Sequence, residues 1–440
     1  MSPSARHQRW ETRPLEVWAK AKSVRNKYDQ SRIKAAEEKK LLVDGRDVQI
    51  FSGYGNLQGV MTNPLGAMTA WSSDQLSRQS RSESECHGFG RDICGYHREV
   101  YGCMYLNKDM LGGTFPKRDI SIPVPAACDQ HSKRGQPMAD FYNIPRFQGE
   151  APVYYGINDP KRNEVMKKHK EGEILDQIEW LEKITKRKLD DEKFRDMMVS
   201  NLRVKKYMGE VCALNQAVPA PLDQKSFFSF YTLGYIVGAD LSETEDLWRE
   251  FRDEMKWRVD NKIAAVATER FRWTENEPPP WYFLKWYRYM ETYGAVCPGS
   301  PYSLGSGGPY EWKKDGTYGP RMSPLDRDDF PLKTREDLVR AYVEVFALGW
   351  GHGDDFRKSN NLVDVAKGWK CDAVILPFAR AGVGCAYGYK ESYIHATDAG
   401  YPTLFWEYSQ PGDRTDFDEN DMLERLDNFM EAQGLRRLED

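Results

Sequence analysis

Near the C-terminal end of the chain, the pattern of apolar and polar positions changes from that of a strand to that of a helix and back to that of a strand. Ala373 to Leu376 is a short apolar run followed by proline, which is typical of a buried strand. Tyr387 to Ala396 has the length and composition of a helix, and Gly400-Tyr401-Pro402 ends it. Thr403 to Trp406 is a second strand, rich in aromatic residues. This order predicts a βαβ unit with parallel strands.

The same order occurs about 250 residues earlier in the chain. Ile120 to Val124 predicts a strand, Gln130 to Phe141 predicts a helix, and Tyr142 to Phe147 leads into a further strand. In both units a cysteine follows the first strand, namely Cys128 and Cys385. In open α/β sheets, ligands bind where the carboxyl ends of strands meet the amino ends of helices. Both cysteines are therefore candidate ligands.

Alternating strands and helices predict an α/β fold. A chain of 440 residues is longer than one hydrophobic core usually organises, so more than one domain is expected. We expect two Rossmann- or flavodoxin-like parallel-sheet domains with helical additions. The predicted boundaries are an N-terminal helical arm over 1–50, a first α/β domain over 51–160, a helical segment over 161–265 and a second α/β domain over 266–440.

Composition narrows the class of protein. Hydrophobic residues make up 40% and charged residues 30% of the chain, which is typical of soluble globular proteins. A net charge of −4 argues against a dominant basic surface for nucleic acid. The most apolar window, residues 227–238, is too short to span a bilayer, and no signal peptide is evident. Eight cysteines without dense spacing indicate reduced thiols. We therefore expect a cytoplasmic protein without a membrane span.

Three cysteines differ from a simple buried thiol, which is the usual role of a lone cysteine. Cys94, Cys128 and Cys385 each lie at a strand end or helix start, among Gly, Ala or Pro residues that let a bulky group approach. A thiolate at Cys94 would be favoured by the amides at the start of a helix. Three thiolates without accompanying histidines favour an iron–sulfur cluster over catalytic zinc. Cys86 rivals Cys94, and Cys297 is a rival third or fourth ligand.

Other side chains are candidates for the surroundings of such a site. His97 and His131 lie near the proposed cysteines and could donate hydrogen bonds to cluster sulfurs, although histidines in such loops are more often structural. Trp281 and Tyr302 flank a loop-rich, aromatic segment and could line a pocket, stack on a substrate or protonate it. No CxxC, HExxH, Walker loop or GxSxG pattern occurs, so any metal site must be assembled from distant segments.

These motifs resemble a known family. The stretch from Cys94 to Gly102 resembles the C-x-x-x-[RK]-x-x-x-G segment of the 2-hydroxyacyl-CoA dehydratase and ATP-dependent (class I) benzoyl-CoA reductase family. Cys128-Asp129 followed by Tyr142-Asn143-Ile144-Pro145 is similar to the second cysteine segment of that family. Cys385 with Gly400 to Glu407 is similar to the third. The resemblance runs from about Ser84 to the end and, through Glu277 to Trp281, looks most like the larger cluster-binding subunit of the reductases.

The resemblance implies a [4Fe-4S] cluster held by Cys94, Cys128 and Cys385. It implies that ATP binds only to partner subunits, which form an ATP-hydrolysing iron–sulfur activator. It also implies a paralogous cluster-binding subunit and a ferredoxin as the upstream electron donor. The implied reaction passes low-potential electrons to an aromatic acyl-CoA, giving a cyclic dienoyl-CoA in anaerobic aromatic degradation. Three alternatives remain open: a 2-hydroxyacyl-CoA dehydratase subunit, a non-catalytic scaffold that carries a cluster, and a metal-free α/β binding protein.

Overall fold

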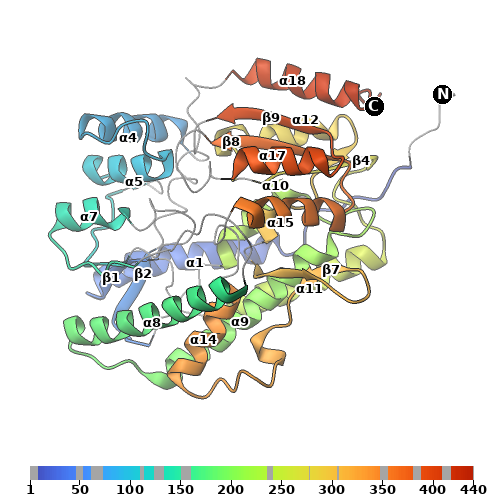
Figure 1. Ribbon diagram of the computed structural model, residues 1–440. Helices are drawn as coiled ribbons and strands as arrows, with labels where there is room; N and C mark the ends of the chain where they lie inside the picture. The colour runs from blue at the N-terminus through green and yellow to red at the C-terminus, as the bar shows by residue number, and fades with distance from the viewer. Residues whose placement is uncertain are drawn as a thin grey trace.

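A computed structural model shows an α/β architecture with long helices (Figure 1). Three residues singled out in the sequence, Cys128, His131 and Cys385, lie outside the residues that it describes. The described residues are 8–45, 53–60, 73–109, 113–122, 133–149, 160–234, 241–276, 278–304, 307–346, 355–379, 388–408 and 418–439.

The strands form two parallel sheets and one hairpin. They are β1 (Leu41–Gly45), β2 (Leu57–Val60), β3 (Ile120–Ile122), β4 (Phe271–Thr274), β5 (Ala295–Val296), β6 (Tyr310–Trp312), β7 (Tyr318–Pro320), β8 (Ala373–Ala379) and β9 (Thr403–Tyr408). The first sheet has the order β2-β1-β3 and the second has the order β5-β4-β8-β9, both with parallel neighbours, while β6 and β7 pair antiparallel. The predicted α/β fold with parallel sheets is confirmed.

Helices surround both sheets. In Figure 1 the first sheet lies at the left with α4, α5 and α7, and the second lies at the right with α15, α17 and α18. The helices are α1 (Trp18–Glu37), α4 (Asp74–Cys86), α5 (Gly95–Leu106), α7 (Gly135–Tyr142), α8 (Pro160–Thr185), α9 (Asp191–Leu214), α10 (Gln224–Tyr231), α11 (Leu241–Asp260), α12 (Lys285–Glu291), α13 (Pro301–Leu304), α14 (Arg335–Phe346), α15 (Asp355–Gly368), α17 (Tyr389–Asp398) and α18 (Glu419–Ala432). Short 3-10 helices are η1 (Thr232–Gly234), η2 (Trp281–Phe283) and η4 (Pro324–Asp326).

The predicted C-terminal βαβ unit is present, whereas the earlier unit has its first strand and its helix followed by a single bridge. In the C-terminal unit, β8 and β9 are parallel and in register from Val374–Thr403 to Ala379–Tyr408, with α17 between them in sequence. In the earlier unit, β3 pairs parallel with β1 and is followed by α7. A parallel bridge between Ser121 and Arg146 then stands where the further strand was predicted. The carboxyl ends of the strands therefore lie at one edge of each sheet.

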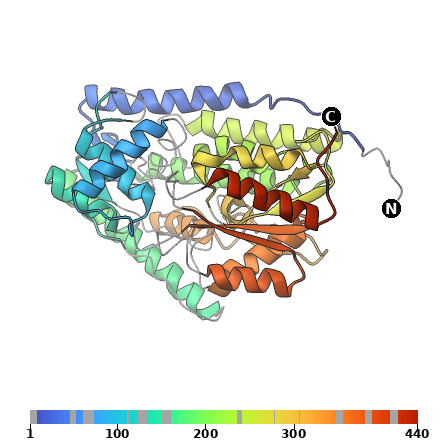
Figure 2. The same cartoon turned by 90° about the horizontal axis from the view of Figure 1, so that it is seen from above.

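The alternation of side chains along β8 explains why helices cover both faces of the second sheet. Val374 and Leu376 belong to one hydrophobic cluster, which includes residues of α15 and α17. Ala373 and Ile375 belong to another, which includes residues of α12, β9 and α18. Successive residues of a strand point to opposite faces, so an unbroken apolar run requires cover on both. Figure 2 shows β8 and β9 between these two helix layers.

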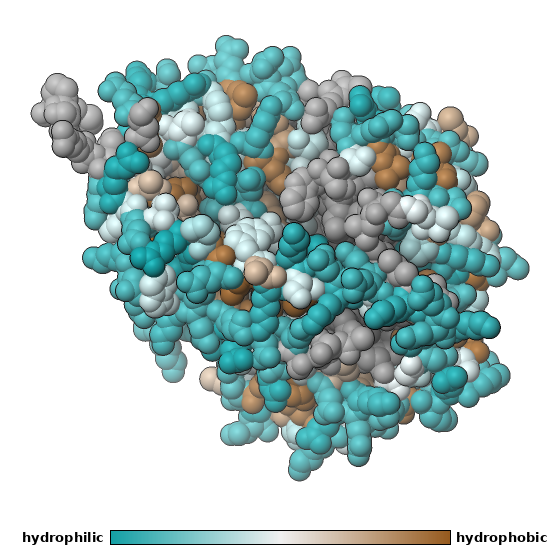
Figure 3. All heavy atoms as spheres, turned by 180° about the vertical axis from the view of Figure 1, so that it is seen from behind, coloured by the Kyte–Doolittle hydropathy of each residue, from teal (hydrophilic) through white to brown (hydrophobic). Residues whose placement is uncertain are grey.

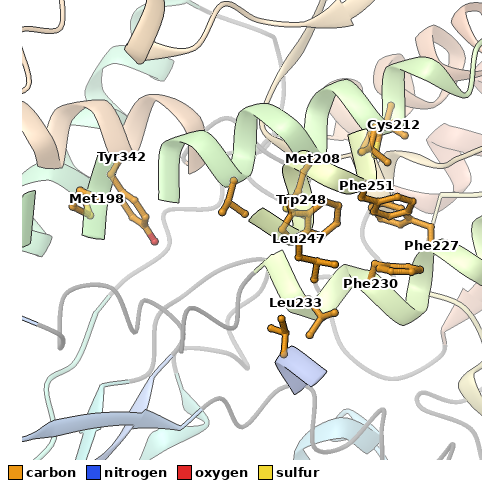
Figure 4. Packing of buried hydrophobic residues seen from close by; sticks show 14 of the residues in the cluster. Met198, Met208, Cys212, Phe227, Phe230, Leu233, Leu247, Trp248, Phe251 and Tyr342 are labelled. Carbon is orange, nitrogen blue, oxygen red and sulfur yellow. The ribbon is translucent and has the colours of Figure 1, made fainter. Parts of the chain in front are cut away.

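The helical segment supplies a large aromatic core of its own. The rings of Phe230 and Phe251 lie 4.4 Å apart, and those of Phe227 and Trp248 lie 6.3 Å apart, which joins α10 to α11. Met208 of α9 belongs to the same buried cluster (Figure 4). Aromatic side chains bury large areas and dominate the energetics of such contacts.

Helix α1 links the two parts of the molecule. It contacts β1 and β2 of the first sheet as well as α11 and η1, and Figure 2 shows it along part of the upper edge. Side chains of α11 hold the residues just before α1. The Glu254 carboxylate accepts the Glu16 and Val17 amides at 3.0 and 3.1 Å, and Arg258 donates to the Pro14 carbonyl at 2.6 Å. The N-terminal segment therefore packs on the body of the protein.

Hydrophilic side chains cover most of the face shown in Figure 3, and hydrophobic residues appear there in small separate groups. None of the helices in the described ranges is long and apolar enough to cross a membrane.

A glycine sets the distance between α4 and α5. A Cβ atom added to Gly102 would lie 1.7 Å from the carbonyl oxygen of Ser80 and 2.5 Å from its Cα atom. These atoms of Ser80 belong to the backbone of α4, so no side-chain rotation could relieve the clash. Only glycine permits this close approach of the two helices.

We predict that Gly102→Ala destabilises the protein by about 1–3 kcal/mol, the usual cost of overpacking a well-packed contact. Urea unfolding followed by circular dichroism measures the effect. Gly172→Ala in α8 is the matched control, since a Cβ atom there meets nothing within 4 Å. That variant should be unchanged or up to about 1 kcal/mol more stable. Equal unfolding free energies for the two variants would contradict the close contact.

Candidate functional site

Cys94 occupies the N-cap position of α5, as predicted from its sequence neighbours. The residue is 6% exposed, with φ −50° and ψ 130°. Its carbonyl oxygen accepts the amides of His97 at 3.0 Å and Arg98 at 3.1 Å, which closes the first helical turn. Amides at a helix start and the helix dipole favour a negatively charged group, so the position suits a thiolate.

Arg98 fixes the turn that carries Cys94. Its side chain is buried, with Nη1 2.7 Å from the Glu85 carboxylate and Nε 3.1 Å from the Ile93 carbonyl oxygen. These contacts tie the end of α4 and the loop before Cys94 to α5. Residues four apart share a helix face, so Arg98 and Gly102 both lie on the side of α5 that meets α4. The spacing of Cys94, Arg98 and Gly102 thus has a structural reason.

A neighbouring face of α5 points toward the carboxyl end of the first sheet. The Tyr101 hydroxyl donates to the Arg134 carbonyl oxygen at 3.4 Å, and the Arg134 guanidinium lies 3.9 Å from the Asp44 carboxylate near the end of β1. Burial and the nearby Arg134 cation lower the pKa of His97 to about 3. His97 is therefore neutral near pH 7 and can donate one N–H, although it carries no charge.

One hydrogen bond connects the cysteine-bearing helix to the second sheet. The Trp281 indole N–H, in η2 soon after β4, donates to the hydroxyl oxygen of Tyr96 in the first turn of α5. Tyr96 also packs against the buried cluster that covers the second sheet. The start of α5 therefore contacts the segment after β4 that contains Trp281.

Trp281 and Tyr302 come together in an aromatic group next to this contact. The Phe228 ring lies 5.1 Å from Trp281 and 6.3 Å from Tyr302, and Tyr231 stacks on Tyr302 at 5.1 Å. Both predicted pocket residues are buried, and neither lines the cavities of 540 Å³ and 440 Å³ among the described residues. A substrate role for either one stays a prediction.

The rival cysteines have different surroundings. Cys86 is exposed at the end of α4. Cys297 is 3% exposed just after β5, where burial and the neighbouring Glu275 carboxylate raise the pKa of its thiol well above the usual value. Its Sγ atom donates to the Gly299 carbonyl oxygen at 3.7 Å. A protonated, hydrogen-bonded thiol of this kind is a core residue rather than a ready metal ligand.

The structure describes one of the three predicted cluster ligands, Cys94, together with the predicted neighbour His97. Cys128, Cys385 and His131 lie in segments without described coordinates. Among the residues that are described, no three His, Cys, Asp or Glu side chains converge as a metal site. The described part fits a cluster ligand, because a soft sulfur is buried at a helix start between the two sheets.

Sequence reasoning missed a buried polar group at the carboxyl end of the second sheet. Glu275, the first residue after β4, accepts the hydroxyl proton of Tyr287 in α12. The next residue, Asn276, donates to the Ser392 hydroxyl of α17 at 3.1 Å. All four side chains are buried. The available signal was the pair Glu275-Asn276 directly after the aromatic-containing segment Phe271-Arg272-Trp273-Thr274.

The cavities lined by described residues include two of several hundred Å³. One of 540 Å³ lies between α5 and α7, with His97 and Tyr101 on its α5 wall. The other, of 440 Å³, lies between the β6–β7 hairpin and α15 and is polar, with Glu311 and Asp364 in its lining. Only the first adjoins the cysteine-bearing turn.

Fold and site together define an α/β protein with a cysteine-bearing helix start held between two parallel sheets. A family model described as 2-hydroxyglutaryl-CoA dehydratase, D-component, matches residues 65–432, and the chain belongs to this family. The match spans Cys94, Cys128 and Cys385. No curated protein matches the chain. The family comprises iron–sulfur subunits of CoA-ester enzymes that work with a partner component.

The hydrogen bond between Trp281 and Tyr96 predicts energetic coupling between α5 and the second sheet. Tyr96→Phe and Trp281→Phe each remove one partner, so a double-mutant cycle on unfolding free energy should give a coupling of about 0.5–1.5 kcal/mol. The Trp312 indole instead donates to Asp364 at 2.7 Å, so Trp312→Phe is the matched control and should add independently to Tyr96→Phe. Additive effects in both pairs would contradict a working hydrogen bond.

Proposed function

We propose that the chain is the cluster-bearing subunit of an ATP-activated acyl-CoA enzyme, with Cys94, Cys128 and Cys385 as ligands of a [4Fe-4S] cluster. The observation that carries this proposal is the placement of Cys94. Its sulfur is buried at the start of α5, and Tyr96 of the same turn is hydrogen-bonded to Trp281 beside the second sheet. A ligand set drawn from both sheets requires such a junction.

Sequence proximity supports the inclusion of the other two cysteines. Lys133, five residues after Cys128 in the sequence, lines the same cavity as His97. Gly388 follows Cys385 by three residues. The Ser392 hydroxyl donates to the Gly388 carbonyl oxygen and accepts from Asn276, at the end of β4. The described residues that follow Cys128 and Cys385 are thus connected to the cavity beside α5 and to the end of β4, respectively.

The bound cluster would supply one-electron transfer at low potential. The residues of this chain position the ligand Cys94 and set the polarity around it. Arg98 and Gly102 fix the turn of Cys94, and neutral His97 can donate an N–H without placing a cation beside the thiolates. The buried aromatic group around Trp281 keeps water away from the junction, which limits loss of electrons to protons.

For the reaction itself, we propose reduction of an aromatic acyl-CoA to a cyclic dienoyl-CoA, as in class I benzoyl-CoA reductases. Support comes from the aromatic rings of Phe228, Trp281, Tyr302 and Tyr231 next to the start of α5. The partners would be a paralogous cluster-binding subunit, an ATP-hydrolysing iron–sulfur activator and a ferredoxin. Dehydration of a 2-hydroxyacyl-CoA is the second candidate, favoured by the description of the matching family.

Iron analysis tests the ligand assignment. Protein purified without oxygen should contain about four iron and four sulfide per chain. Cys94→Ser, Cys128→Ser and Cys385→Ser should each lose most of the iron and the associated visible absorbance. Cys86→Ser, at the exposed end of α4, and Cys297→Ser, in the core, are controls that should keep it. Full iron in the Cys94 variant, or iron-free wild-type protein, would refute the assignment.

An activity comparison separates the two reactions. With the activator, ATP and reductant present, the assembled complex should reduce benzoyl-CoA and leave 2-hydroxyacyl-CoA unchanged. The opposite preference would establish the dehydratase. Iron-replete complex that turns over neither thioester would instead indicate a subunit that carries a cluster without catalysing the reaction. Product analysis by mass spectrometry distinguishes the dienoyl-CoA from the enoyl-CoA.

A further inference from the structure

The 540 Å³ cavity between α5 and α7 begins beside the cysteine-bearing turn and leads away from it. Ile93, immediately before Cys94, lines the cavity, followed by His97 and Tyr101. His97 and Tyr101 are four residues apart on one side of α5, so the cavity follows about one turn of the helix from the loop that carries Ile93. A ligand that occupied it would have one end next to Cys94.

The chemistry of the cavity suits an anion. Lys133 and Arg146 contribute two cations, and Gln136 and Gln148 add amide groups. The described residues that line it include no carboxylate. Arg146 donates through Nη1 to the Gln148 amide oxygen, which orients the guanidinium. Planar guanidinium groups bind phosphate oxygens in pairs, and lysine binds them as a point charge.

The same cavity has an apolar wall. The rings of Phe89 and Tyr101 lie 4.7 Å apart, and Ile93 is beside them. The volume lies within the range of roughly 300–1,000 Å³ that small-molecule sites occupy. Cations and amides opposite an aromatic wall fit a ligand with both phosphates and an apolar part. The cavity near β6 and β7 differs in its lining, which includes the carboxylates of Glu311 and Asp364.

We propose that the cavity between α5 and α7 binds the phosphorylated arm of a CoA thioester and directs the thioester toward the start of α5. Lys133 and Arg146 bind the phosphates, and the wall of Phe89, Ile93 and Tyr101 packs against the remainder of the arm. This inference rests on the proposed function, because the cluster ligand Cys94 defines which end of the coenzyme points inward. Lys133 and Arg146 are then binding residues that the family assignment does not supply.

Calorimetric titration of the cluster-containing chain with CoA tests the proposal under anaerobic conditions. Lys133→Gln should weaken CoA binding by roughly 10-fold, since a hydrogen bond to a charged group contributes about 1.5–3 kcal/mol. The double variant Lys133→Gln/Arg146→Gln should weaken it considerably more. Pantetheine, which lacks the phosphates and the nucleotide, should bind weakly to the wild type and to both variants alike. Arg321→Gln, in the other cavity, is the matched control and should bind CoA like the wild type.

Three results would overturn the inference: equal CoA affinity in wild type and the folded Lys133→Gln variant, displacement of CoA by an equal concentration of inorganic phosphate, and ADP binding as tight as CoA. The latter two would indicate a general anion or nucleotide site. Iron content of the same samples keeps the two proposals apart. Iron-free wild-type protein refutes the cluster, whereas normal iron with CoA binding that ignores Lys133 and Arg146 refutes only this cavity.

Discussion

The close packing of α4 on α5 is the constraint on which the rest of the site depends. Gly102 lets the helices approach until backbone meets backbone at Ser80, and Arg98 closes the contact with Glu85. Burial of Cys94 follows from this packing, because the turn before α5 is held by the same arginine through the Ile93 carbonyl. A larger residue at 102 would push the cysteine away from the second sheet without touching any ligand.

Two kinds of interaction bring the sheets to this helix. Hydrophobic packing fixes the positions of the two sheets relative to α5. It acts through the aromatic core of α10 and α11 and through the helices on both faces of β8. A few polar contacts then set the orientation at the junction, namely Trp281 with Tyr96 and Arg134 with Asp44. Apolar burial is non-directional, whereas hydrogen bonds and ion pairs have defined geometry. This division is consistent with a site formed by residues distant in sequence.

Local signals carried most of what could be predicted from the sequence. The strands at Ile120 and Ala373, the helix start at Cys94 and the parallel pairing of β8 with β9 all follow from short-range periodicity and turn residues. The central strand β1 over Leu41–Gly45 was not predicted, because only three apolar residues, Leu41 to Val43, precede Asp44-Gly45, a pair typical of turns. Contacts between distant residues, such as Tyr96 with Trp281, have no local pattern at all. The predicted domain boundaries and the ligand roles of Cys128 and Cys385 stay predictions.

The course of α1 has a mechanical consequence. The helix contacts the first sheet at one end and α11 at the other, and its entry is fastened by Glu254 and Arg258. A motion that separated the two sheets would pull α1 away from α11. Glu254 and Arg258, which form a nearly fully buried ion pair, would then become exposed. The two side chains both belong to α11 and would stay paired, but their hydrogen bonds to the Val17 amide and the Pro14 carbonyl oxygen would be lost, and hydrogen bonds to charged groups are the stronger ones. The contacts at both ends of α1 therefore resist separation of the two sheets.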